Sequence, residues 1–176
     1  MTAEQLDIYQ AFGNYAVDNL FWRLLFIDST MFSTPIKEET KKQMLESYKQ
    51  FELILSGILD AEKSEKLTRQ MAENNRLFVE YIENLLVGCP HLDTIREKWL
   101  ENGRQFAQML CEMSAYWKKA EWNAMITHEI HLLDAIARGM LAGNYNIFID
   151  TSPICKRLAV DMAAYMSMGL CRDRKF

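Results

Sequence analysis

Apolar side chains in this chain recur at the spacing of an α-helix, and no segment shows the sustained alternation of a β-strand. Capping residues, prolines and glycines interrupt this pattern at intervals. The pattern therefore predicts an all-α chain, with helices over about residues 2–32, 35–60, 64–87, 93–113, 118–143 and 153–169.

Local signals mark the ends of these helices. Thr2 and Gln5 have the spacing of a capping box, in which each side chain bonds the backbone of the other residue. Thr34-Pro35 places a capping residue before a proline at the first helical position, and Thr151-Ser152-Pro153 repeats this arrangement. We expect the last helix to begin there and to stop at Gly169.

The connections between the predicted helices are short, which favours antiparallel neighbours. We therefore expect an up-and-down helical bundle of about six helices with a four-helix core. The chain has 176 residues, of which 49% are hydrophobic and 25% charged, as is typical of one globular domain. Residues 1–176 are taken as a single domain.

The first predicted helix is apolar on two sides. One stripe extends from Leu6 to Met31, and a second contains Tyr15, Trp22 and Phe26. A helix of this kind lies either at the centre of a bundle or at a subunit interface. If other helices of the chain cover the second stripe, the protein is a monomer. Because a two-fold interface is the commonest way to cover an exposed stripe, we expect a homodimer through Tyr15, Trp22 and Phe26.

Composition and charge argue against several classes of function. The net charge is −4 and no predicted helix carries a basic stripe, so we expect no nucleic-acid partner. The longest apolar stretch is interrupted by Arg23, so we expect no membrane partner. No glycine-rich phosphate loop or paired cysteine motif occurs. The acidic first residues do not resemble a secretory signal, so we expect a cytoplasmic protein.

Polar residues on inward helix faces are the main chemical feature of the sequence. Glu129 falls near the centre of the apolar stripe of its helix, and we expect it to be buried. An unpaired buried charge costs several kcal/mol, so such groups need partners or a ligand. The candidate polar core consists of Arg23, Asn74, Asn75, Asn102, Glu129 and Asp161.

Three explanations of this polar core remain open. Arg23 and Glu129 can form a buried ion pair that fixes the helix register. The residues can instead surround a ligand or metal, or the helix faces can be misassigned so that the residues lie in water. Bundles that hold two iron ions use Glu-x-x-His pairs, which are missing here, and His128 and His131 turn toward the surface. We therefore expect no metal and no cofactor.

Five segments resemble a known family: FWRLLFIDST at 21–30, KWLENGRQFA at 98–107, YWKKAEWNAM at 116–125, GNY at 143–145 and YMSMGL at 165–170. The family consists of small helical bacterial proteins of unestablished activity, some of which carry an acetylglutamate kinase name. The resemblance covers most of the chain. It implies a polar or metal-binding core with inward-facing histidines and acids.

The resemblance implies site residues at Arg23 and Asn102, which match the family pattern. Asn74 and Glu129 stand where the family tends to have histidine, and Arg104 replaces an acid, which speaks against a metal. An amino-acid kinase needs a parallel sheet and glycine-rich turns at its phosphates. Because this chain offers neither, we reject the kinase name.

Two functions are consistent with these observations. The first is a non-catalytic helical bundle that binds a partner or associates with itself through the first helix. The alternative is a ligand- or metal-binding bundle built around Glu129, Asn74, Asn102 and Arg23. No nucleophile and base stand in a recognisable arrangement, so we assign no catalytic residues and do not expect an enzyme.

Overall fold

The computed structural model describes residues 2–173, and the regular structure in that part of the chain is entirely helical. The all-α prediction is therefore confirmed. Seven helices follow one another within the described residues: α1 (Ala3–Met31), α2 (Lys37–Glu46), α3 (Tyr48–Ser56), α4 (Ala61–Leu86), α5 (Leu92–Met113), α6 (Lys119–Leu141) and α7 (Asn146–Asp173).

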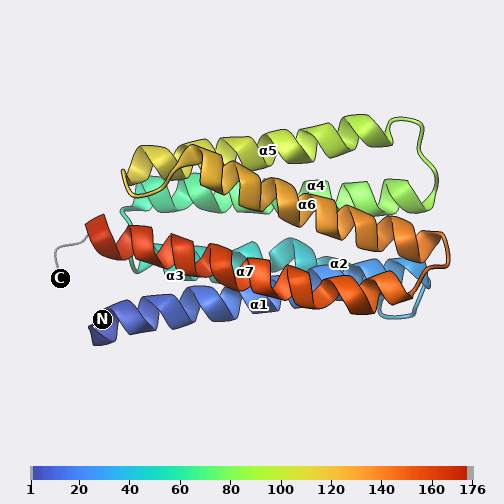
Figure 1. Ribbon diagram of the computed structural model, residues 1–176, viewed down its shortest axis with the longest axis horizontal. Helices are drawn as coiled ribbons and strands as arrows, with labels where there is room; N and C mark the ends of the chain where they lie inside the picture. Colours follow the sequence, from blue (N-terminus) through green and yellow to red (C-terminus); the bar gives the residue numbers. More distant parts are fainter. Residues whose placement is uncertain (1, 174–176) are drawn as a thin grey trace.

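The helices run up and down and pack as a closed bundle (Figure 1). Helix α1 runs one way, α2 and α3 together return along it, and α4 to α7 then alternate in direction. Helix α2 packs on α1, and α3 to α6 each pack on the next helix of the chain. Helix α7 also packs along α1, so the first and last helices close the bundle. Within the described residues no helix combines the length and apolar character that crossing a bilayer requires.

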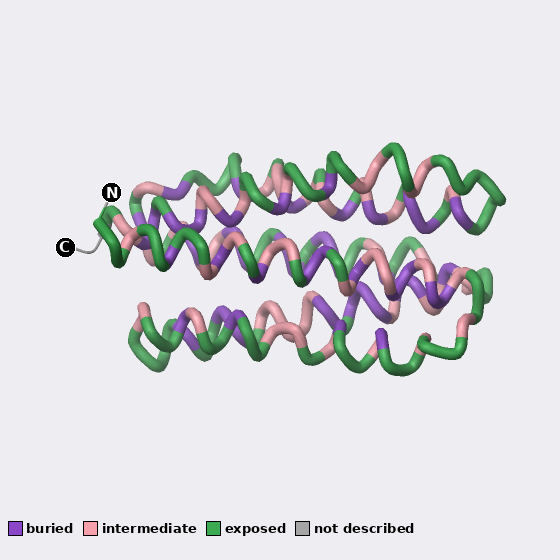
Figure 2. Tube along the Cα trace, turned by 90° about the horizontal axis from the view of Figure 1, so that it is seen from below, coloured by how far each residue is buried: buried purple, intermediate pink, exposed green. Residues whose placement is uncertain are grey.

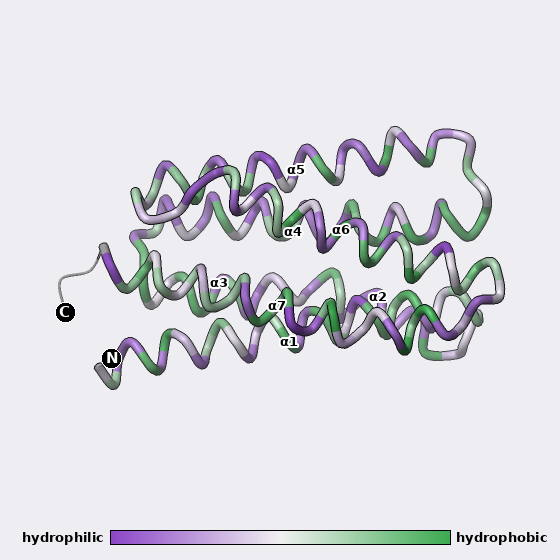
Figure 3. The backbone as a smooth tube through the Cα atoms, viewed as in Figure 1, coloured by the Kyte–Doolittle hydropathy of each residue, from purple (hydrophilic) through white to green (hydrophobic). Residues whose placement is uncertain are grey.

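Every helix contributes buried side chains to the interior. Buried positions recur along the helices between exposed ones (Figure 2), and polar and apolar segments alternate in the same way (Figure 3). The predicted four-helix core is thus extended by buried residues of the remaining helices, such as Met44 of α2 and Phe51 of α3. Burial of these amphipathic faces is the main source of stability.

The second apolar stripe of α1 is covered by the chain itself. Tyr15 is buried against Phe51, with ring centroids 5.2 Å apart. Phe26 is buried against Phe78 of α4 at 6.0 Å. The expectation that Tyr15 and Phe26 form a homodimer interface is therefore wrong, because helices α3 and α4 remove both side chains from water. Only Trp22 of the expected interface remains half-buried.

The predicted helix over 35–60 is divided into α2 and α3 at Ser47. The Ser47 hydroxyl donates a hydrogen bond of 3.0 Å to the carbonyl of Met44 and accepts bonds from the amides of Asn19 and Asn75. The Asn75 amide also donates to the Met44 carbonyl at 3.1 Å. Long-range polar contacts thus hold the interruption between the two helices in place.

The last helix begins earlier and ends later than its local signals predict. Helix α7 starts at Asn146, so Pro153 lies within it, on an exposed face. Gly169 also lies inside α7. A Cβ atom at Gly169 would come within 2.1 Å of the Trp117 ring, so this glycine allows close packing and does not end the helix.

The packing at Gly169 leads to a first prediction. Gly169→Ala should reduce the free energy of unfolding by about 1–3 kcal/mol, because the added methyl group must displace the Trp117 ring. Gly13→Ala is the matched control, since a Cβ atom at Gly13 meets no atom within 4 Å. It should stabilise the protein by roughly 0.5–1 kcal/mol. Urea unfolding followed by circular dichroism measures both, and equal stabilities would contradict the packing role.

Candidate functional site

The central feature of the site is the buried guanidinium group of Arg23 on α1. Its Nε donates to Oδ1 of Asn19 at 2.9 Å, one helical turn earlier. Its Nη2 donates to Oδ1 of Asn74 at 2.7 Å and to Oδ1 of Asn75 at 3.4 Å. The guanidinium carbon lies 5.0 Å from the ring centroid of Phe78, close enough for a cation–π contact.

The amides that surround Arg23 continue into a wider network. Asn74 of α4 donates from Nδ2 to Oδ1 of Asn102 on α5 at 2.9 Å. The Asn102 carbonyl accepts from Gln70 at 2.9 Å, and the Asn102 amide donates to the Gln70 carbonyl at 3.3 Å. Each side chain that bonds Arg23 within the described residues is a neutral amide. The positive charge is therefore hydrogen-bonded without being neutralised by a contacting carboxylate.

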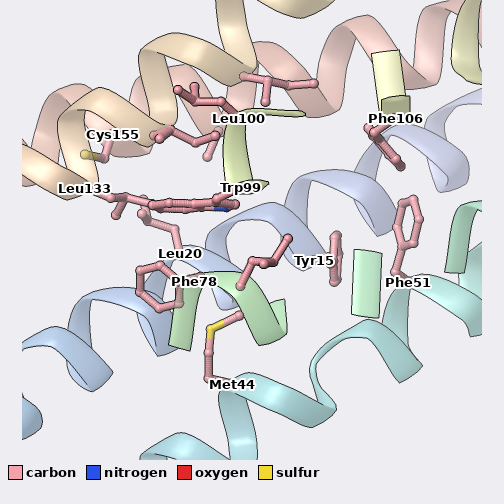
Figure 4. Close-up of a cluster of buried hydrophobic side chains, with 14 of the residues drawn as sticks. Tyr15, Leu20, Met44, Phe51, Phe78, Trp99, Leu100, Phe106, Leu133 and Cys155 are labelled. Atoms are coloured by element: carbon pink, nitrogen blue, oxygen red, sulfur yellow. The ribbon is translucent and has the colours of Figure 1, made fainter. Parts of the chain in front are cut away.

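A cavity of about 100 Å³ lies beside this network, among helices α1 and α3 to α7. Most of its wall is apolar. The rings of Phe51 and Phe106 lie 6.2 Å apart, and Figure 4 shows them gathered with Tyr15 on one side of the hydrophobic cluster. The polar part of the wall is made by Tyr15, Asn19, Arg23, Gln70, Asn74, Asn102, Trp122 and Glu129.

Three buried donors of the cavity wall have no hydrogen-bond partner among the described residues. They are Nη1 of Arg23, the hydroxyl of Tyr15 and Nε1 of Trp122. The exposed fractions of these three residues are 2%, 6% and 1%. A buried donor left without an acceptor costs about 1–3 kcal/mol, more for a charged group. They are three of nine buried side-chain atoms without a partner in the described part of the chain, and the other six belong to residues outside the cavity wall. At the cavity wall, a bound molecule or water is the available source of acceptors.

Glu129 of α6 is the only acidic residue in the described part of the cavity wall. It is half-buried, and it forms no hydrogen bond or ion pair with the described residues. The ion pair of Arg23 with Glu129 considered from the sequence is therefore not formed, although both residues line the same cavity. Arg23 is held by the amides of α1 and α4, which leaves Glu129 free to face the cavity space.

Burial and the charges of Arg23 and Glu129 shift the pKa values of Tyr15 and Cys155. Burial raises the pKa of the Tyr15 hydroxyl, the Arg23 cation acts in the opposite direction, and Glu129 adds to the rise. Tyr15 is therefore a protonated donor at neutral pH. Burial raises the pKa of the Cys155 thiol to about 11, and Glu129 acts in the same direction. A thiol with this pKa is a poor nucleophile at neutral pH.

The remaining candidates of the sequence have other positions. Asn75 is fully buried but does not line the cavity. Its side chain bonds Arg23 and the hydroxyl of Ser47, the residue between α2 and α3. Asp161 is exposed on α7, so its assignment to the polar core is wrong: it lies beside the apolar stripe, on the side turned to water. His128 and His131 are exposed, as expected.

Sequence reasoning missed three members of the site. Asn19 carried a usable signal, because it precedes Arg23 by four residues and so lies on the same face of α1. Tyr15 and Trp122 belong to apolar stripes, and no sequence pattern distinguishes a bonded hydroxyl or indole N–H from an unpaired one. Their importance emerges only from the packed structure.

A second polar cluster lies outside the cavity. Tyr81 donates to Asp134, which also accepts a bond of 2.7 Å from Arg138 and pairs with Arg96 at 3.2 Å. The cluster joins α4, α5 and α6, and none of its members lines the cavity. Asp134 thus links the three helices through Tyr81, Arg96 and Arg138, although Arg96 contributes an ion pair and its Nε makes no hydrogen bond.

Comparisons with protein-family models, with curated protein sequences and with solved structures gave no match. In the part of the chain that the structure describes, no group of three or more histidine, cysteine, aspartate or glutamate side chains is placed to hold a metal ion. The interpretation of the site therefore follows from its own geometry.

The amide network leads to a second prediction. Asn74→Ala should reduce the free energy of unfolding by about 1.5–3 kcal/mol, because it removes a hydrogen bond to a buried cation. Asn84→Ala is a matched control on the same helix, since the half-buried Asn84 amide donates only to the carbonyl of Glu80. It should cost about 0.5–1.5 kcal/mol. Urea melts of the two variants compare the bonds directly, and equal losses would argue against the role of Asn74.

Proposed function

We propose that this protein is a non-catalytic binding protein whose central cavity holds a small molecule. The bound molecule presents a hydrogen-bond-accepting group to Arg23, Tyr15 and Trp122 and an apolar part to the aromatic wall. The polar core is then a ligand site and not a purely structural network. Its residues are Arg23, Tyr15, Asn74, Trp122 and Glu129.

One observation carries the proposal: three residues that line one cavity each have a buried donor without an acceptor. A core that served stability alone would do better with apolar side chains at these positions, because unpaired buried donors are destabilising. Donors held in place before a ligand arrives bind it without further ordering, which favours affinity. The amide network of Arg23 supplies this preorganisation.

The apolar wall limits the size and character of the ligand. Phe12, Phe51, Phe106 and Met166 contribute apolar surface to the cavity. Its volume of about 100 Å³ is smaller than the roughly 150 Å³ of an engineered cavity that binds benzene. Methionine side chains adapt their shape at low cost, so slightly larger molecules can be accommodated. The expected ligand is therefore a compact molecule with a short apolar part.

The same wall favours binding over catalysis. Within the described residues it contains one carboxylate and no histidine, cysteine, serine or lysine. General acid–base catalysis usually employs a pair of groups whose pKa values lie near the working pH. The Tyr15 hydroxyl is far from that condition, because burial raises its pKa. These features support a receptor or carrier, not an enzyme.

A cytoplasmic location is part of the proposal. Cys89, Cys111 and Cys155 are free thiols, of which Cys155 is buried and the other two are half-buried. Unpaired cysteines in a chain of this size fit a reducing compartment better than an oxidising one.

Blocking the cavity tests the proposed function. A panel of small carboxylic acids, amides, alcohols and amino acids is screened by thermal shift, and binding is measured by isothermal titration calorimetry. We expect at least one compound to bind, and Ala163→Leu to abolish its binding, because Ala163 is a buried residue of the cavity wall. Ala124→Leu makes the same change on the exposed side of α6 and should leave binding intact. Binding that survives Ala163→Leu, or a panel without any binder, would contradict the proposal.

A further inference from the structure

The cavity wall carries one charge of each sign, and the two do not touch. Arg23 is 2% exposed, and its bonded nitrogen atoms contact only amides of asparagine. Glu129 is half-buried and makes no ion pair or hydrogen bond with the described residues. Tyr15 lines the same cavity, and its pKa is lowered by the charge of Arg23 and raised by that of Glu129. Such an arrangement leaves both ends of the site available to a ligand.

The charge balance of the cavity restricts which ligand fits. A molecule with only a carboxylate, placed at Arg23, would bring a second negative charge into a poorly solvated space beside Glu129. A molecule with only an ammonium group, placed at Glu129, would bring a second positive charge close to Arg23. A zwitterion gives each protein charge its own counter-charge and adds no net charge to the interior.

Resting on the proposed function of the cavity, we propose that its ligand is a compact zwitterion of the amino-acid type. Its carboxylate binds Nη1 of Arg23, and its ammonium group binds the carboxylate of Glu129. The class includes α-amino acids and ω-amino acids with short apolar parts.

The unpaired donors match the acceptor capacity of a carboxylate. An ionised carboxylate offers about four lone-pair positions for hydrogen bonds. Nη1 of Arg23 provides two N–H groups, and the Tyr15 hydroxyl and the Trp122 indole provide one each. The Tyr15 hydroxyl keeps its proton at neutral pH, because burial raises its pKa. The acceptor capacity of one carboxylate therefore equals the number of N–H and O–H groups on the three unpaired donors of the cavity wall, which are three of the nine unpaired buried atoms in the described part of the chain.

The other half of the wall suits an ammonium group. Glu129 supplies the only carboxylate among the described lining residues. The aromatic rings of Phe12, Phe51 and Phe106 belong to the same wall, and aromatic faces attract ammonium groups. These rings also exclude long polar substituents. The volume of about 100 Å³ favours molecules of the size of alanine or β-alanine over large amino acids.

The decisive experiment compares matched ligands by isothermal titration calorimetry at neutral pH. The zwitterions are alanine, β-alanine and valine. Propionate and isovalerate lack the ammonium group, and ethylamine and isobutylamine lack the carboxylate. At least one zwitterion should bind, and its singly charged analogues should bind roughly tenfold more weakly or worse, the effect of losing one charged hydrogen bond. Analogues that bind as tightly as the zwitterion overturn the inference, and so does the failure of every zwitterion to bind.

Substitution of Glu129 should change the preference between the zwitterion and propionate. Damage to the fold would weaken the binding of both ligands and would not produce this change. In Glu129→Gln the isosteric amide removes the negative charge of the wall. This variant should bind the zwitterion roughly tenfold more weakly and should bind propionate more tightly than the native chain does. Glu52→Gln makes the same change at an exposed position of α3 and should leave the selectivity unchanged. A Glu129→Gln variant that keeps the native preference for the zwitterion contradicts the assignment.

The outcomes separate this inference from the proposed function. If neutral or singly charged molecules bind and Ala163→Leu abolishes their binding, the cavity is a ligand site and the zwitterion is wrong. If neither the zwitterions nor any other compound of the screening panel binds, both proposals fail together.

Discussion

The arrangement of this bundle depends on the burial of one cation, the guanidinium group of Arg23, among neutral amides. A buried charge without hydrogen bonds would cost more free energy than a small domain can lose. The oxygens of Asn19, Asn74 and Asn75 meet this requirement from α1 and α4. Since Asn74 also bonds Asn102, the same requirement fixes α5 relative to α1 and α4.

Two departures from regular packing accompany this network. Asn75 bonds both Arg23 and Ser47, so the interruption between α2 and α3 is tied to the position of the cation. Gly103 lies next to Asn102 on α5, and a Cβ atom there would come within 2.5 Å of Ile126 on α6. The glycine lets the two helices approach closely beside the cavity. Polar contacts and this close approach therefore shape the cavity, which apolar packing alone would tend to fill.

The sequence predicts those features of the fold that depend on contacts within one helix. It does not predict features that depend on contacts between residues far apart in the chain. The capping box of Thr2 with Gln5 is formed, because it involves one helical turn. Helical periodicity placed Arg23 correctly on an inward face. It could not show that Ser47 interrupts a helix, since the amides that bond Ser47 come from other helices. The unpaired hydroxyl of Tyr15 is equally invisible in a sequence, because a missing partner is a property of the whole packed interior.

A crystal structure of the protein, purified without organic additives, tests the central claim most directly. The account predicts Arg23 bonded to Asn19 and Asn74, with ordered electron density for a small molecule or water about 2.7–3.2 Å from Nη1 in an open cavity. Glu129 should face the same space without contacting Arg23. A structure in which Glu129 pairs directly with Arg23 and side chains fill the cavity would contradict the account, because the polar core would then be a closed structural ion pair.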